Sequence, residues 1–369
     1  MKIKEINLYK INMQMKHPFT TSFGTEYDRI FILVEVKNDE GLSGWGECVT
    51  SDRPLYIEEF TDASWLMLEK YLAPLVLQDD INHPEDLQDK FKIYKRNHLA
   101  KAAIDEALWD LYAKSKGVSL AKALGGEKSS VEVGISLGIE DNVDDLLTNI
   151  QKKTEDGYKR IKIKIKPGKD LEVLETVRNE YPDIPLMVDA NSAYNLEDLN
   201  LFKEMDRYNL MMIEQPLTAG DLHDHAKLQR EIKTPICLDE SIHSYENAKQ
   251  AIELGSCKII NMKVGRVGGL TEAVKIHQLC EKENIPLWCG GMLESGIGRA
   301  HNVAIASLAG FTLPGDTASS SRYWEKDVIK PEVVARNGTV TVPDSPGIGF
   351  QVNKEEILSH TVDSTKICS

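Results

Sequence analysis

The stretch Arg160-Ile-Lys-Ile-Lys-Ile-Lys-Pro-Gly168 decides how this chain folds. Isoleucine and lysine alternate strictly through it, and this period of two predicts a β-strand with its lysines on one face. Pro167 and Gly168 end the strand, because proline cannot donate to a ladder and glycine permits a turn. One interpretation is a solvated edge strand, in which lysines prevent edge-to-edge pairing. The other is a strand whose lysines point into a functional site.

Four more apolar strands follow, and each leads to a charged residue. These charged residues are Asp189, Glu214, Asp239 and Lys263. Counted from Lys164, successive charged positions are 25, 25, 25 and 24 residues apart, and helical patterns fill the intervals. A strand, a helix and two loops take about that length, so the spacing predicts repeated βα units.

Apolar strands that alternate with amphipathic helices predict a parallel sheet that is buried on both faces. We therefore expect an α/β fold with a (β/α)8-type barrel over residues 126–324, in which the C-terminal strand ends converge on one mouth. Residues 1–125 lack the βα repeat. We expect them to form an α+β capping domain that is completed by about residues 325–369, at the C-terminal tail.

Several segments carry more local expectations. Between two N-terminal strands, residues 17–24 are expected to form a mobile loop over the site, and a second loop at residues 49–56 could close from the other side. The glycine-rich segment 290–298 is either a rim that binds a carboxylate through its N–H groups or a tight structural turn. The other expected elements are helices at 56–77 and 100–116, a first barrel strand at 131–137, and a weak eighth strand at 311–316.

The composition is that of a folded globular protein, with 41% hydrophobic and 28% charged residues among 369. No run of 18 apolar residues is present, and the N-terminus begins a strand without a secretory signal, so neither a membrane span nor secretion is expected. A net charge of −14 argues against a nucleic-acid partner. The six cysteines lack Cys-x-x-Cys spacing, which favours free thiols in a reducing cytoplasm.

The three acidic strand ends predict a metal site. Asp189, Glu214 and Asp239 offer hard oxygen ligands without cysteine or histidine in register, which suits Mg²⁺, with Mn²⁺ as an alternative, and disfavours zinc. No organic cofactor is expected. A carboxylate substrate bound there could lose its α-proton, because the metal stabilises the enediolate charge more than the ground state. A lysine of the alternating strand would be the base, and the residues alone leave open which one; Lys263 would act from the other side.

At these residues the chain resembles the enolase superfamily, in its muconate-lactonising subgroup, over nearly the whole length. That superfamily is known to combine lysine or histidine bases with Mg²⁺. The resemblance implies an enolase-like modified TIM barrel, with Lys164 as the proton-transfer residue and Lys162, Asn191 and Glu240 in supporting roles. The matching segments are Lys162-x-Lys164, Asp189-Ala-Asn191, Glu214-Gln-Pro216, Asp239-Glu-Ser241 and Asn261-Met-Lys263.

Three further segments are similar to the o-succinylbenzoate synthase / N-succinylamino acid racemase family: Gly44–Cys48, Pro18–Gly24 and Gly290–His301. This resemblance implies a syn dehydration of 2-succinyl-6-hydroxy-2,4-cyclohexadiene-1-carboxylate to o-succinylbenzoate in menaquinone biosynthesis. Lys164 would abstract the α-proton and Lys263 would stabilise the enediolate. The positions that match substrate-lining residues of the family are Phe19, Phe23, Tyr56, Ser136, Gly291 and Leu293.

Other functions are weighed against this one. With a lysine on each face, the same site could racemise N-succinylamino acids or other N-acylamino acids, as an alternative or a second activity. A more remote alternative is a barrel that binds a small-molecule carboxylate without turnover, although burying these charges without a metal would be costly. Mandelate-racemase-like members carry a histidine where residues 288–291 have none, and dipeptide epimerases carry an Asp-x-Asp that residues 315–318 lack. Muconate cycloisomerase is excluded only by the weaker motifs. The sequence does not fix the preferred acyl group or the oligomeric state, for which a homo-oligomer is one option.

Overall fold

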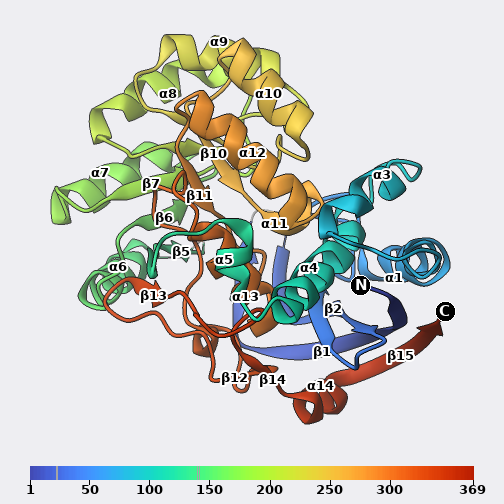
Figure 1. Ribbon diagram of the computed structural model, residues 1–369. Coiled ribbons are helices and arrows are strands. Elements are labelled where there is room, and N and C mark those ends of the chain that lie inside the picture. Colours follow the sequence, from blue (N-terminus) through green and yellow to red (C-terminus); the bar gives the residue numbers. More distant parts are fainter. Residues whose placement is uncertain (22–23, 139, 141) are drawn as a thin grey trace.

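The structure is a computed structural model that describes residues 1–21, 24–138, 140 and 142–369. A βα barrel and a capping domain of sheet and helices pack side by side, as Figure 1 shows. Within the described residues, no helix is long and apolar enough to cross a membrane. The barrel with a separate cap is the fold class that the sequence predicted.

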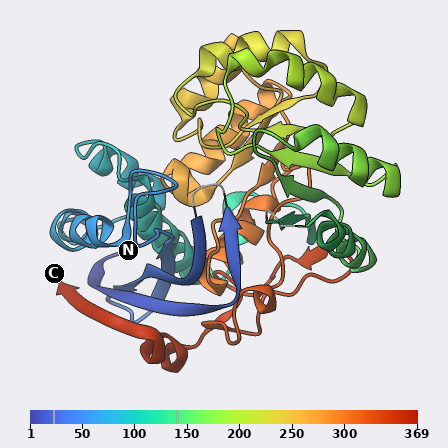
Figure 2. The same ribbon diagram turned by 180° about the vertical axis from the view of Figure 1, so that it is seen from behind.

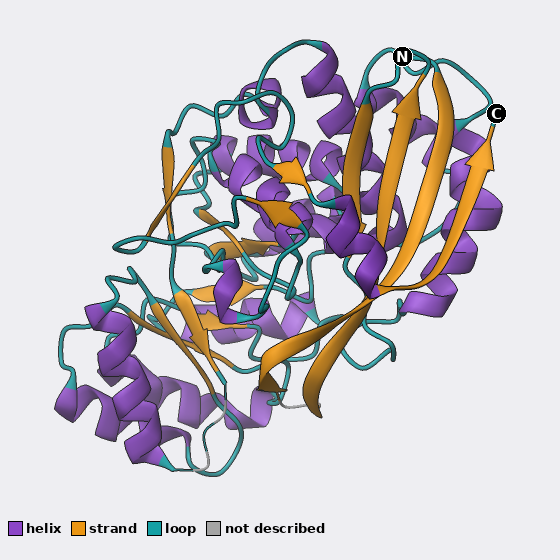
Figure 3. Cartoon of the chain, turned by 90° about the horizontal axis from the view of Figure 1, so that it is seen from below, coloured by secondary structure: helices purple, strands orange, loops and turns teal. Residues whose placement is uncertain are grey.

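An antiparallel sheet forms the centre of the capping domain, with four strands in the part of the chain that the structure describes, in the order β15-β1-β2-β3. The last strand of the chain pairs with the first, so that Glu5 lies opposite Cys368. The two termini are consequently close together at one end of the sheet (Figure 3). The strands are β1 (Ile3–Thr21), β2 (Gly24–Asn38), β3 (Ser43–Cys48) and β15 (Thr361–Cys368).

Helices cover one face of this sheet, and the longest of them packs directly on β3. They are α1 (Thr61–Met67), α2 (Ala73–Val76), α3 (Leu87–Phe91), α4 (His98–Ser115) and α5 (Leu120–Leu124), with a π-helical turn at Leu68–Leu72 and a 3₁₀ turn at Pro84–Asp86. Close packing is possible because β3 has glycine where it meets α4. A Cβ added at Gly44 would lie 2.0 Å from the Ala107 carbonyl oxygen, and one at Gly46 would lie 2.0 Å from that of Ala103.

A parallel sheet forms the wall of the barrel, with seven described strands in the order β11-β10-β9-β8-β7-β6-β5. These strands are β5 (Ile135–Leu137), β6 (Ile161–Lys164), β7 (Leu186–Asp189), β8 (Ile213–Glu214), β9 (Ile236–Leu238), β10 (Ile259–Met262) and β11 (Leu287–Cys289). The helices between and after them are α6 (Val143–Glu155), α7 (Asp170–Glu180), α8 (Leu199–Met205), α9 (Leu222–Glu231), α10 (Tyr245–Leu254), α11 (Val264–Val267), α12 (Leu270–Lys282) and α13 (Gly296–Ala306). Single 3₁₀ turns occur at Leu196–Asp198, Asp206–Tyr208 and Ser320–Arg322.

An irregular segment, and not a strand, closes the barrel between β11 and β5. The expected strand at 311–316 is therefore wrong as secondary structure. The segment nevertheless lies where the eighth strand was expected and bonds to the chain on both sides. The Leu313 amide donates to the Leu287 carbonyl at 3.2 Å and the Asp316 amide to the Cys289 carbonyl at 2.8 Å. On the other side, the Gly134 amide donates to the Gly315 carbonyl at 2.7 Å.

The alternating strand lies inside the barrel wall, so the interpretation as a solvated edge strand is wrong. β6 has β5 on one side and β7 on the other. Ile161 and Ile163 are buried on one face, and Lys162 on the other face is only 4% exposed. Of the three lysines, only Lys166, beyond the end of the strand, is exposed.

Three other expectations need correction. Residues 17–21 continue β1, so that a long β1–β2 hairpin extends toward the barrel (Figure 2) where a loop was expected. The expected helix at 56–77 begins only at Thr61, because residues 51–60 form turns that line the site. The expected first barrel strand at 131–137 is split: β5 belongs to the barrel, whereas β4 (Ser130–Glu132) pairs with β13 (Thr339–Thr341).

The C-terminal tail crosses both parts of the molecule. Its elements are β12 (Ile329–Lys330), β13, β14 (Gln351–Val352), α14 (Lys354–His360) and β15. β13 pairs with β4 beside the barrel, and β15 pairs with β1 in the cap. The domain boundaries expected near residues 125 and 325 stay predictions.

The packing of α4 on β3 generates a prediction of stability. We expect Gly46→Ala to lower the free energy of unfolding by about 3 kcal/mol, because the added methyl meets rigid helix backbone. Gly220→Ala is a matched control, since a Cβ there meets nothing within 4 Å, and it should change the value by less than about 0.5 kcal/mol. Urea-induced unfolding measures both, and equal stability of the two variants would contradict the close-packing argument.

Candidate active site

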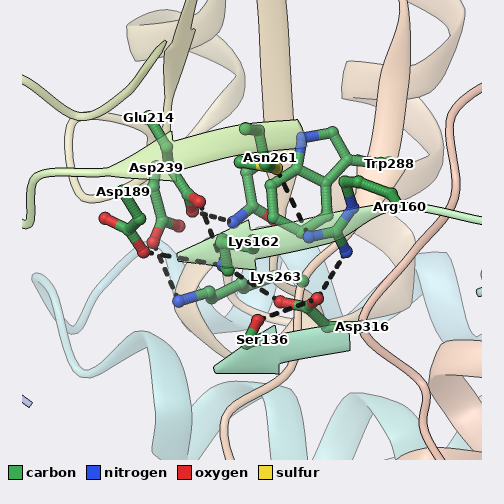
Figure 4. Close-up of polar contacts among 12 residues, drawn as sticks. Ser136, Arg160, Lys162, Asp189, Glu214, Asp239, Asn261, Lys263, Trp288 and Asp316 are labelled. Carbon is green, nitrogen blue, oxygen red and sulfur yellow. Dashed lines mark hydrogen bonds and ion pairs between the residues drawn. The ribbon is translucent and has the colours of Figure 1, made fainter. Parts of the chain in front are cut away.

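The strand register brings the predicted charged residues together at one mouth of the barrel. Lys164 at the end of β6 lies beside Asp189 at the end of β7, and Asp189 lies beside Glu214 at the end of β8. Asp239 follows β9 and Lys263 follows β10 directly. Figure 4 shows the three carboxylates side by side with Lys162 and Lys263 next to them. Parallel neighbouring strands of similar length produce this arrangement, because each strand ends at the same level.

Lys164 is fixed by two side chains on the next strand and its loop. Its Nζ lies 2.6 Å from Asp189 Oδ2 and 2.6 Å from Asn191 Oδ1. Asn191 in turn donates to Glu240 Oε1 at 3.0 Å. The supporting roles that the sequence suggested for Asn191 and Glu240 therefore correspond to one hydrogen-bonded chain that ends on Lys164.

Lys263 approaches from the other flank of the carboxylates. Its Nζ lies 2.8 Å from Asp239 Oδ2 and donates to the Tyr56 hydroxyl at 2.8 Å. Burial opposes its charge, but Asp239 and Tyr56 outweigh burial and raise the pKa of Lys263 well above its ordinary value. Lys263 is therefore a fixed cation in this arrangement, and Tyr56 connects it to the capping domain.

Lys162 lies deeper than Lys164 and contacts three carboxylates. Its Nζ is 3.0 Å from Glu214 Oε2, 3.1 Å from Asp316 Oδ2 and 3.5 Å from Asp189 Oδ2. Burial lowers its pKa, yet the three carboxylates, Asp316 foremost, raise it above the ordinary value on balance. Lys162 thus neutralises charge beneath the site.

Asp316 links Lys162 to a second buried cation. Arg160 Nη2 forms an ion pair with Asp316 Oδ1, and Ser136 donates to the same oxygen at 3.1 Å. The Arg160 guanidinium and the Lys162 ammonium both lie over the Trp288 ring, 4.7 and 4.9 Å from its centroid. Figure 4 shows this group beside the carboxylates. This charged group lies in the interior of the barrel, which bulky apolar side chains fill in most barrels of this type.

A cavity opens between this mouth and the capping domain. Many of the predicted site residues line it: Phe19, Tyr56, Ser136, Lys162, Lys164, Asp189, Asn191, Lys263, Gly291 and Leu293. Glu214, Asp239 and Glu240 are buried beneath the lining and do not form part of it. Phe23, also expected to contact substrate, lies outside the described residues.

The glycine-rich rim is a structural turn, and the alternative interpretation as an anion-binding rim is wrong for its main N–H groups. The Ser295 and Gly298 amides donate to Glu47 at 3.0 Å each, and the Gly296 amide donates to Asp327 at 2.7 Å. Carboxylates of the protein itself therefore satisfy the N-terminus of α13. Because Glu47 belongs to β3, this contact also holds the rim against the capping domain.

The buried acids are crowded, so that burial and neighbouring carboxylates oppose the ionisation of two of them. Burial is the largest cause that raises the pKa of Glu214, and the neighbouring Asp189 and Asp239 raise it further. Lys162 opposes them, and the pKa is about 8 on balance. Burial, Asp239 and Asp189 raise the pKa of Glu240 to about 7, and no hydrogen bond among the described residues reaches its buried Oε2. A hard divalent cation would stabilise such crowded oxygen atoms, so the donor set fits Mg²⁺ or Mn²⁺.

The side chains as positioned bind their own lysines. Within the described ranges, no three His, Cys, Asp or Glu side chains converge closely enough to hold a metal ion. Lys164 and Lys263 contact Asp189 Oδ2 and Asp239 Oδ2, which belong to two of the three predicted metal ligands. A metal would therefore compete with the two ammonium groups, which would free these lysines for substrate.

Several residues of the site received no role in the sequence analysis. Arg266 pairs with Asp239 Oδ1, and Asn261 donates to Glu214 Oε1 at 2.7 Å. Asp316 was noted only for the absence of a second aspartate after it. One signal was available for Arg160: it lies two residues before Lys162 and so on the same strand face. Asp316 gave no such signal, since an irregular segment positions it.

Comparison with known proteins relates the chain to enzymes with this architecture. The family model "Mandelate racemase / muconate lactonizing enzyme, N-terminal domain" matches residues 4–125, and "Enolase C-terminal domain-like" matches residues 145–357. The chain is 54% identical to an o-succinylbenzoate synthase of Geobacillus kaustophilus, over 97% of this chain and 96% of the relative. It is 47% identical to an N-succinylamino acid racemase of Thermus thermophilus, over 95% of each. A crystal structure of an enolase superfamily member from Listeria innocua is 41% identical, with a TM-score of 0.97, over 100% of this chain and 99% of that one.

The ion pairs beneath the site generate a prediction of stability. Asp316→Asn should lower the free energy of unfolding by about 3–5 kcal/mol, because it leaves Arg160 and Lys162 buried without their shared carboxylate. The control is Asp344→Asn, which breaks an ion pair with Lys122 whose side chains are both exposed and should cost less than about 1 kcal/mol. The comparison is made by urea unfolding; a small effect of Asp316→Asn would mean that the buried cations find other partners.

Proposed function

The chain belongs to the enolase superfamily, in its mandelate racemase / muconate lactonizing enzyme branch, and we propose that it acts there as an o-succinylbenzoate synthase. The reaction is the syn dehydration of 2-succinyl-6-hydroxy-2,4-cyclohexadiene-1-carboxylate. The observation that carries the proposal is that Lys164 and Lys263 line one cavity. Lys164 ends β6 and Lys263 follows β10, and the strands that lead to the three acidic residues lie between these two. This arrangement suits removal of a proton next to a carboxylate.

Lys164 is the proposed proton-transfer residue. As a neutral amine it would take the α-proton from the substrate, and the electron pair left behind would move into the carboxylate to give an enediolate. The same ammonium group would then protonate the departing hydroxyl on the same face, so that water leaves and the ring becomes aromatic. The hydrogen bond from Asn191 to Glu240 keeps Asn191 oriented toward the amine.

Lys263 is the proposed cation beside the enediolate. Its charge is maintained by Asp239, and its hydrogen bond to Tyr56 fixes the direction in which the ammonium group points. A cation held in place before the reaction stabilises developing negative charge without reorganisation, which is the usual basis of such catalysis. Arg266 also pairs with Asp239 and shares the neutralisation of that carboxylate.

The proposed metal ligands are Asp189, Glu214 and Asp239, and the proposed ion is Mg²⁺, with Mn²⁺ as a substitute. When bound, the ion would supply positive charge for the substrate carboxylate and for the charge that develops on it. The crowding of these buried acids, described above, supports this assignment. The free, mostly buried cysteines support a reducing compartment, and we place the enzyme in the cytoplasm on that basis.

A second activity, racemisation of N-succinylamino acids, is favoured by one specific observation. Lys164 and Lys263 both line the cavity, so one could remove the α-proton and the other could return a proton to the opposite face. The relative from Thermus thermophilus bears the name of that activity. Initial rates on both substrates separate the functions: a kcat/KM on the cyclohexadiene that is negligible beside that on N-succinylamino acids would contradict the synthase.

The lysine roles are tested by substitution. Lys164→Ala should lower kcat of dehydration by about 10³-fold or more, because the proton-transfer group is lost. The control is Lys166→Ala, which removes an exposed lysine two residues further along and should leave kcat unchanged. Lys263→Ala should also abolish both activities, whereas Lys263→Arg should retain part of the dehydration and lose racemisation, since a guanidinium stays charged. Full activity in either alanine variant would remove that residue from the mechanism.

The metal assignment is tested by removing the metal ion from the enzyme and adding it back. Dialysis against EDTA should abolish dehydration, and Mg²⁺ or Mn²⁺ should restore it, while Zn²⁺ should not. Glu214→Gln should weaken Mg²⁺ binding measured by calorimetry, a readout that does not depend on turnover. Full activity of the metal-depleted enzyme would contradict the proposed ligand set.

A further inference from the structure

A small side recess opens from the main cavity between the start of β2 and the turn at residues 51–56. Glu26, Ser51, Arg53 and Tyr56 line both the recess and the main cavity, so the two spaces adjoin each other. The recess lies on the capping-domain side, whereas the carboxylates and catalytic lysines lie on the barrel side. It therefore faces the part of a substrate that does not react.

Six cations line the main cavity in the part of the chain that the structure describes, and the protein itself engages five of them. The three lysines contact Glu214, Asp189 or Asp239, as described above. Arg29 is only 4% exposed and donates to Glu26, to Ser51 and to three backbone carbonyls. Arg299 is 2% exposed and donates to the carbonyls of Glu294 and Ala318.

Arg53 is the sixth cation and differs from the others. Its side chain is 65% exposed and pairs with Asp52, whose side chain is 59% exposed, with Nε 3.6 Å from Oδ2. Exposed ion pairs at this distance contribute little, so the guanidinium can exchange this partner for another anion. A guanidinium matches a carboxylate with two parallel hydrogen bonds, which makes arginine the side chain best suited to that task.

The turn that carries Arg53 is attached to the catalytic centre. Leu55 donates its amide to the Arg53 carbonyl at 2.9 Å, and Tyr56 at the end of the turn accepts a hydrogen bond from Lys263. The backbone of Arg53 is therefore held near the reacting centre, and the residue lines the recess. The other anion facing it, Glu26, is already neutralised by Arg29 at 2.7 Å.

The substrates of both proposed activities are dicarboxylates. One carboxylate lies next to the carbon that loses its proton, and the other ends a flexible succinyl chain. The proposed metal site would take the first, which leaves the second for a cation of the cavity lining, and a guanidinium would bind it through two parallel hydrogen bonds. We propose that Arg53 binds this distal carboxylate in the side recess and thereby selects dicarboxylic substrates. The proposal rests on the proposed function and adds a specificity-determining residue to it.

Equilibrium binding tests this assignment without turnover. The probes are o-succinylbenzoate, which carries the distal carboxylate, and 2-butanoylbenzoate, in which a methyl group replaces it. Calorimetry on the full-length Mg²⁺-loaded enzyme should give a preference of about 5- to 10-fold for the dicarboxylate, the range expected for a bidentate pair with a mostly exposed guanidinium. Arg53→Met should reduce this preference to about twofold and leave the affinity for 2-butanoylbenzoate unchanged. Arg53→Lys should retain part of the preference, because it keeps the charge and loses the planar fork.

The control is Arg230→Met, which removes an exposed arginine on α9 outside the cavity and should leave both affinities unchanged. An unchanged preference in Arg53→Met, an equal loss of affinity for both probes, or failure of the unmodified enzyme to bind the dicarboxylate would each overturn the inference. Failure of the proposed function is distinct, since it would appear as no dehydration or racemisation by an enzyme whose dicarboxylate preference still depends on Arg53.

Discussion

The structure depends on mutual compensation of buried charges at one end of the barrel. Asp189, Glu214 and Asp239 are brought together by strand register, and none of them reaches bulk water. Lys162 offsets them from beneath, and Asp316 in turn offsets Lys162 and Arg160. Such a set is stable only as a whole, because removal of one member leaves another charge uncompensated in a medium of low polarity.

The capping domain contributes to the site through a few long-range contacts. Glu47 on β3 caps α13 and holds the rim that follows β11, while Tyr56 bonds to Lys263. These contacts require β3 and α4 to pack closely, which the glycines of β3 permit. The two domains therefore determine the geometry of the catalytic centre jointly. A change in the packing of the capping domain would reach Lys263 through its hydrogen bond to Tyr56.

The repeat of charged strand ends was enough to predict the barrel and to bring Lys164, Asp189, Glu214, Asp239 and Lys263 to one mouth, because register in a parallel sheet follows from strand spacing. Sequence could not place Asp316, since an irregular segment without periodicity closes the barrel. It also could not show that α13 is capped by Glu47, a contact between residues 248 positions apart. Local pattern predicts what regular elements carry, and it fails where distant loops meet.

The pairing of β15 with β1 has a consequence for biosynthesis. β1 is synthesised long before β15, so the edge of β1 that β15 covers stays open until β15 has been made. During that interval a long strand offers unpaired backbone groups to other nascent chains. Loss of β15 alone would therefore spare every proposed catalytic group and still yield a protein prone to aggregate.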